Sequence, residues 1–130
     1  MLNRKTLAIA VMIVAALTLA GTLVAQMSAP SVSRVVLVET ADPAGYAAAI
    51  AEGQAILNGL GSTATIRVWQ ARFAGDNTGA VVASIEWPSM AAMAADDALM
   101  GGSEEMGAWI AGLAGLRTIV SDSLYQEITQ

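Results

Sequence analysis

The feature that most restricts the possible folds of this chain is the spacing of apolar residues along residues 34–128, which changes several times between strand-like and helix-like patterns. The segment RVVLVET, residues 34–40, is β-branched and almost continuously apolar, which predicts a strand covered on both faces. Apolar residues then recur every three or four positions over residues 46–60, which predicts a helix. Asp42 can cap this helix, and Pro43 suits its first position.

A predicted hairpin follows this first helix. Residues 63–75 alternate between two faces, DNTG at residues 76–79 is typical of a turn, and AVVASIEW at residues 80–87 predicts the next strand. Pro88 cannot donate to a strand ladder, and its φ angle is fixed near a helical value. We therefore expect the strand to end there and Ser89 to cap a second helix.

The second helical segment is interrupted by the glycines at 101–102 and restarts at Ser103, a predicted cap. The expected buried stripe of the restarted helix is Met106, Trp109, Ile110 and Leu113. Residues 116–128 predict a fourth strand or a strand with a bend. The order β-α-β-β-α-β predicts an α+β, ferredoxin-like fold, in which a four-stranded antiparallel sheet has two helices on one face.

The first 25 residues have the layout of an export signal. Arg4 and Lys5 precede an apolar run over residues 7–25, and small residues lie near its end. We expect cleavage after Ala25, with Ala20 as an alternative site. The other interpretation is an uncleaved anchor, because the run has 19 residues.

These features predict the division of the chain. We expect a signal peptide at residues 1–25, a linker at 26–33 and a folded domain at 34–130. The expected location is the periplasm or the outside of the cell. Contact with a membrane is expected only through an uncleaved leader.

The composition excludes several kinds of chemistry. The sequence has no cysteine and no histidine, so it can form no disulfide, thiolate nucleophile or imidazole ligand. The net charge of −5 argues against nucleic acid as a partner, because nucleic-acid binding needs a basic surface. No cofactor is expected.

One layer of helices leaves the other face of such a sheet uncovered, although the strands are apolar on both faces. A second copy usually covers that face, which predicts a homodimer joined through its sheets. The chain here resembles the dimeric α/β-barrel superfamily, most closely its small uncharacterised and NIPSNAP-like members. The resemblance rests on the element order over residues 34–128 and on the segments IEWPSMAAMAA, GGSEEM and RTIVSDSLYQEI.

The resemblance implies a pocket between the sheet and its helices. It also implies a range of roles, because the superfamily includes cofactor-independent monooxygenases, small lactone isomerases, haem-handling enzymes and domains of unknown role. This sequence departs from the enzymes in lacking histidine, so haem ligation and imidazole base chemistry do not carry over. The fold by itself says little about activity.

Two positions on the strands stand out as site candidates. Glu86 is the candidate catalytic residue, because a carboxylate beside Trp87 at the end of a strand can be desolvated and act as a base. The alternative is that Glu86 is an acidic residue that faces solvent at the end of the strand. Arg67 shares a face with Trp69 and is a candidate anchor for an anionic ligand. The alternative for Arg67 is a dimer seam, where it pairs with an acid of the other copy.

The predicted ligand-binding residues are Arg67, Trp69, Trp87 and Tyr46. The methionines at 90, 93, 100 and 106 are expected to fill the core rather than to line a pocket. The acidic pairs at 96–97 and 104–105 match no calcium loop. We expect them on the solvated surface and predict no metal site.

Three functions of different classes remain open. The favoured one is an exported, homodimeric and non-catalytic domain that binds a small, partly apolar molecule or a protein partner. The first alternative is a cofactor-independent enzyme of the monooxygenase or isomerase kind. The second alternative is a structural accessory subunit of an envelope assembly.

Overall fold

The computed structural model describes residues 29–128, and the predicted signal at residues 1–25 lies outside them. The elements are β1 (Val32–Glu39), α2 (Pro43–Gly59), β2 (Thr65–Gln70), η1 (Gly75–Asn77), β3 (Val81–Trp87), α3 (Met90–Gly101), α4 (Glu104–Leu113) and β4 (Thr118–Gln126). This is the predicted order, with the second helical segment divided into α3 and α4. Within the described range, no helix is long and apolar enough to cross a membrane.

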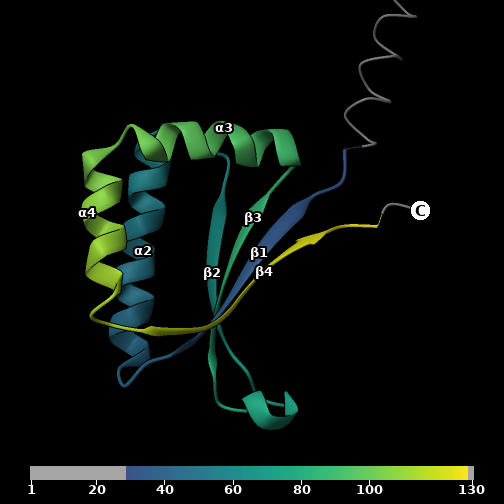
Figure 1. Cartoon of the computed structure of the whole chain (residues 1–130), viewed down its shortest axis with the longest axis vertical. Helices are drawn as coiled ribbons and strands as arrows, with labels where there is room; N and C mark the ends of the chain where they lie inside the picture. Colours follow the sequence, from purple (N-terminus) through teal and green to yellow (C-terminus); the bar gives the residue numbers. More distant parts are fainter. Residues whose placement is uncertain (1–28, 129–130) are drawn as a thin grey trace, which may run out of the picture. The chain divides into compact units, whose positions relative to one another are not determined.

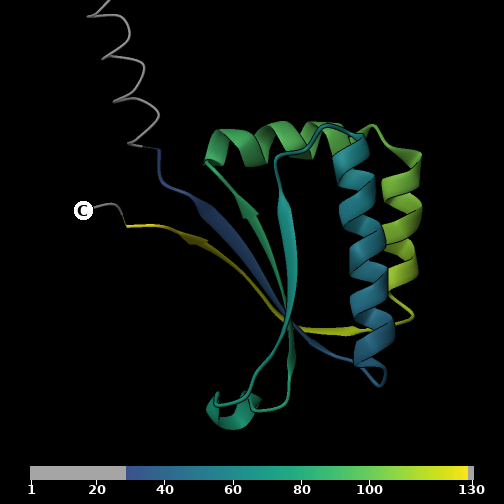
Figure 2. The ribbon, with the colours of Figure 1, turned by 180° about the vertical axis from the view of Figure 1, so that it is seen from behind.

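The four strands form one antiparallel sheet in the order β2-β3-β1-β4. Helices α2 and α4 lie side by side on one face of this sheet, and α3 runs across their ends (Figures 1 and 2). In the part of the chain that the structure describes, no helix covers the opposite face (Figure 2). The prediction of a ferredoxin-like α+β fold is confirmed.

The hydrophobic core lies between the sheet and the helices, because the strands turn alternate residues toward α2 and α4. It consists of two clusters of buried side chains. The first contains Val36, Val38, Tyr46, Ile50, Val81, Ala83 and Leu113. The second contains Val32, Leu57, Ala64, Trp87 and Met106.

The predicted helix caps are confirmed. The Asp42 side chain accepts a hydrogen bond from the Gly45 amide at 2.9 Å, at the start of α2. At the start of α3 the Ser89 hydroxyl accepts a hydrogen bond from the Ala92 amide at 3.1 Å. At the start of α4 the Ser103 hydroxyl accepts one from the Met106 amide, also at 3.1 Å. Because Pro88 has no N–H, β3 ends at Trp87 and the chain enters α3 through the Ser89 cap.

Two predicted boundaries were wrong. β1 begins at Val32, inside the predicted linker 26–33, because Val32 has strand partners on both sides, Trp87 on β3 and Gln126 on β4. β2 ends at Gln70, short of the predicted end of the strand. Beyond it, a tight connection forms in which the Gly79 amide donates to the Ala71 carbonyl at 2.7 Å.

The early end of β2 changes the surroundings of Arg67. The alternation predicted over residues 63–75 would place Phe73 on the face that carries Arg67 and Trp69. It lies instead on the connection between β2 and β3, where its side chain is completely exposed.

Candidate functional site

A cavity of about 150 Å³ lies on the helix side of the sheet, between the strands and helices α2, α3 and α4. Its walls are almost entirely apolar. They include Ile66, Ala83 and Ile85 from the sheet and Met100, Met106, Trp109 and Leu113 from the helices. An apolar cavity of about this size holds a molecule as large as benzene.

The cavity opens between α4 and β4. Ile110 on α4 and Ile119 on β4 both line it, and both are about half exposed, at 51% and 49%. Ile110 was predicted to belong to the buried stripe of its helix. That prediction was wrong because Ile110 lies at the mouth of the cavity, next to β4, which forms the edge of the sheet.

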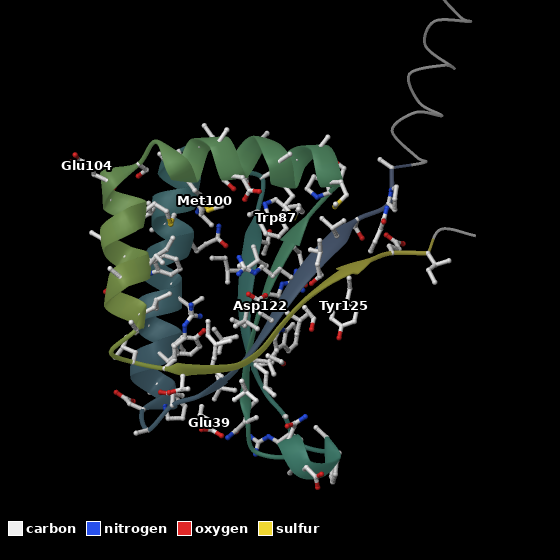
Figure 3. All side chains as sticks on the ribbon, in the orientation of Figure 1. Glu39, Trp87, Met100, Glu104, Asp122 and Tyr125 are labelled. Carbon is white, nitrogen blue, oxygen red and sulfur yellow. The ribbon has the colours of Figure 1, made fainter. Side chains whose placement is uncertain are left out.

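Two indole rings form part of the cavity wall, and the N–H group of each already has a partner. Trp87 donates its Nε1–H to Oδ2 of Asp96 at 2.6 Å. Trp109 donates its Nε1–H to the carbonyl oxygen of Ala49 at 2.7 Å. Both rings therefore present apolar surface to the cavity. Trp87 and Met100 are directed toward the same region below α3 (Figure 3).

Asp96 is buried, with 3% of its surface exposed, so the prediction of a solvated acidic pair is wrong for this residue. It accepts hydrogen bonds from Trp87 and, at 2.5 Å, from the Ser62 hydroxyl. The helical spacing contained the signal for this burial, because Asp96 shares one face of α3 with Met93 and Met100. Asp97 is exposed, as predicted.

Arg34 and Arg117 also line the cavity. Arg34 binds Asp122 through two hydrogen bonds, Nε to Oδ1 at 2.8 Å and NH2 to Oδ2 at 2.5 Å. Arg117 donates to the Tyr46 hydroxyl at 2.8 Å. The hydrogen bond from Arg34 lowers the pKa of the Asp122 carboxyl, and the charge of Arg117 lowers that pKa further. The two arginines therefore belong to one charged cluster around Asp122.

Sequence reasoning missed Arg34, Arg117 and Asp122 as members of a site. A usable signal existed for Arg34, because it alternates with Val32 and Val36 on the apolar face of β1. The position of Asp122 depends on the pairing of β1 with β4, which joins segments 88 residues apart in the chain. Asp122 and Tyr125 lie on opposite sides of β4 (Figure 3).

The predicted ligand-binding residues divide between the two faces of the sheet. Trp87 lines the cavity, and Tyr46 lies fully buried under Arg117. Arg67 and Trp69 point to the face without helices and do not line this cavity. Their roles in ligand binding stay predictions.

Glu86, the candidate catalytic residue, is also on the face without helices. Its carboxylate lies 3.9 Å from the guanidinium of Arg67, and both side chains are about half exposed. On the same face, Trp69 donates its Nε1–H to the Ser84 hydroxyl at 2.9 Å. The structure thus separates Glu86 from the cavity, and none of the described residues that line the cavity is acidic.

Comparisons with known proteins identify the fold. No family model and no curated protein sequence matches the chain. The crystal structure of a mutant of SnoaB, a cofactor-independent oxygenase from Streptomyces nogalater, matches with a TM-score of 0.54 and 17% identity over 78% of this chain and 94% of that chain. A NIPSNAP family protein from Agrobacterium tumefaciens matches with a TM-score of 0.58 and 16% identity over 78% and 87%. This chain therefore shares the ferredoxin-like α+β fold of these two structures, which is the fold that its sequence predicts.

Proposed function

We propose that this protein is a non-catalytic binding domain that takes up a small, partly apolar molecule in the cavity between the sheet and its helices. The observation that carries the proposal is the cavity itself, whose apolar walls surround a space of about 150 Å³. Ligand pockets generally combine apolar walls with a few polar groups that fix orientation. Arg34 and Arg117 are such groups here.

The position of Glu86 supports binding over catalysis. A general base must lie within hydrogen-bond reach of the proton that it removes. Glu86 lies across the sheet from the cavity and faces Arg67. The fold is also that of a cofactor-independent oxygenase, but a shared fold does not carry an activity with it.

A homodimer and an exported location complete the proposal. The face of the sheet without helices carries Val35 and Leu37, both only partly exposed in the single chain, beside the more exposed Trp69. A second copy placed on this face would bury them. Export rests on the signal pattern of residues 1–25, and intact-mass measurement on protein from the cell envelope and medium tests it. The full 130-residue mass in the membrane fraction would favour the anchor instead.

The test of binding uses toluene, a neutral probe of one aromatic ring. The chain has three tryptophans, and their indole N–H resonances report on both faces of the sheet. We expect saturable shifts of the Trp87 and Trp109 resonances and a constant Trp69 resonance. Ala83→Leu should abolish these shifts because the larger side chain fills the cavity.

The matched control is Ala48→Leu, which adds the same atoms at an exposed position of α2 and should leave the shifts unchanged. Toluene shifts that do not saturate, or that survive Ala83→Leu in a folded protein, would contradict the proposed function.

A further inference from the structure

The charges around the mouth of the cavity do not balance. Arg34 and Arg117 both line the cavity, and Asp122 is the carboxylate that binds Arg34. The hydrogen bond to Asp122 raises the pKa of Arg34, and the charge of Asp97 adds a smaller contribution to that pKa. Asp122 is bound by both its oxygens to Arg34. Within residues 29–128, Arg34 and Arg67 form ion pairs, and Arg117 forms none. The cluster of Arg34, Arg117 and Asp122 thus carries one surplus positive charge.

The hydrogen-bond donors that the cavity wall can offer to a ligand are also positively charged groups. The indole N–H groups of Trp87 and Trp109 are both engaged by the protein. Arg117 has five N–H donors, and the Tyr46 hydroxyl accepts from one of its nitrogens. The donors that remain for a ligand therefore belong to guanidinium groups, which bind carboxylates in a planar and often bidentate geometry.

We propose that the ligand is a small monoanion with an apolar body about the size of one aromatic ring, and that its carboxylate binds Arg117 at the mouth of the cavity. This inference rests on the proposed function, because it assigns the charge and size of the molecule that the same cavity takes up. Tyr46 is a positioning residue in this site, since its hydroxyl fixes the guanidinium of Arg117 and its own side chain is fully buried.

Three probes of one shape and different charge test the inference: benzoate, benzamide and benzamidine, which carry charges of −1, 0 and +1 near pH 7. Binding is measured as the saturable shift of the Trp87 and Trp109 indole resonances. We expect benzoate to bind about tenfold tighter than benzamide, which corresponds to about 1.4 kcal/mol. Benzamidine should bind more weakly than benzamide. The preference for benzoate should also fall as ionic strength rises.

Arg117→Met should remove the preference for benzoate over benzamide. Because this change leaves the buried Tyr46 hydroxyl without its donor, the double variant Arg117→Met/Tyr46→Phe provides a second form in which neither group is left unpaired. Arg72→Met is the matched control, since Arg72 is exposed on the connection between β2 and β3. The control should keep the full preference.

The outcomes separate this inference from the proposed function. Equal binding of benzoate and benzamide, or an unchanged preference in a folded Arg117→Met/Tyr46→Phe variant, would overturn the anion site and leave the apolar cavity as a binding site. If none of the three probes nor toluene shifts the Trp87 and Trp109 resonances, both proposals fail.

Discussion

The carboxylate of Asp96 joins three segments that are far apart in the chain: the connection after α2, the end of β3 and the middle of α3. Its two donors are Ser62 and Trp87. Asp96→Ala leaves the buried indole N–H of Trp87 without a partner, and we expect the free energy of unfolding to fall by about 1–3 kcal/mol. Urea unfolding followed by tryptophan fluorescence measures the change.

The neighbour of Asp96 provides the control. Asp97→Ala removes the same side chain at an exposed position and should change the free energy of unfolding by less than about 0.5 kcal/mol. Equal effects of the two substitutions would show that the buried hydrogen bonds of Asp96 add nothing to stability.

The ion pair between Arg34 and Asp122 predicts a pH dependence. The hydrogen bond from Arg34 lowers the pKa of Asp122 in the folded protein, so the pair stabilises the fold above the unfolded pKa, about 3.9. That contribution is lost as the pH falls through the lower folded pKa. Because the pair is partly exposed, we expect the wild type to exceed Asp122→Asn in stability by at most about 1 kcal/mol at pH 7.

Urea midpoints of the wild type and Asp122→Asn between pH 2 and pH 7 test this pH dependence. The difference between the two proteins should shrink below about pH 4 and approach zero at the lowest pH. A difference that stays constant over the whole range would contradict the role given to the Arg34–Asp122 pair.

The contact between α2 and α4 depends on a glycine. A Cβ atom at Gly53 would overlap the indole ring of Trp109, which is held in place by its hydrogen bond to Ala49. Helix propensity alone would make Gly→Ala favourable in α2 by about 1 kcal/mol. We expect the overlap to dominate, so that Gly53→Ala lowers the free energy of unfolding by about 1–3 kcal/mol.

Gly107→Ala is the matched control for the helix contact. Gly107 lies within α4, and nothing is close to where its Cβ would be. This substitution should stabilise the protein by about 0.5–1 kcal/mol. A stabilising effect of Gly53→Ala in thermal or urea unfolding would show that α2 and α4 can move apart at low cost.

Local chemistry explains which elements could be predicted. The Asp42 and Ser89 caps and the stop at Pro88 follow from neighbouring residues, so the sequence predicts them correctly. The end of β2 depends on a hydrogen bond between Ala71 and Gly79, and spacing in the sequence does not show such a contact. The candidate site was harder to predict for the same reason. The cluster around Asp122 forms only when β4 pairs with β1.

At the scale of the whole molecule, the sheet has one covered face and one face without helices. Residues paired across strands share a face, so Val35, Leu37 and Val82 lie opposite the core together with Trp69 and Arg67. Two polar pairs on this face are already formed in a single chain, since Arg67 lies beside Glu86 and Trp69 binds Ser84. A surface with an apolar centre and matched polar groups is suited to contact with a second copy of itself.

The variant Arg67→Met distinguishes between two roles of Arg67, as a residue of the dimer interface (the seam) and as an anchor for a ligand. If Arg67 is at the seam, the variant leaves Glu86 unpaired, and the dimer should weaken by about 1–3 kcal/mol while benzoate binding per folded dimer is unchanged. If Arg67 anchors a ligand, the variant stays dimeric and loses binding of anions. Sedimentation equilibrium together with benzoate titration measures both properties in one sample.

Val82→Lys tests the dimer at the centre of the face without helices. Val82 pairs with Leu37 on β1 and with Trp69 on β2, so a second sheet placed on this face would enclose a lysine there without a partner. An unpaired buried charge is costly, and we expect the wild type to sediment as a dimer at micromolar concentration and Val82→Lys to sediment as a folded monomer. Ala55→Lys, at an exposed position of α2, adds the same charge and should remain dimeric. A wild-type protein that is monomeric at this concentration, or a Val82→Lys variant that is still dimeric, would show that the sheets do not form the interface.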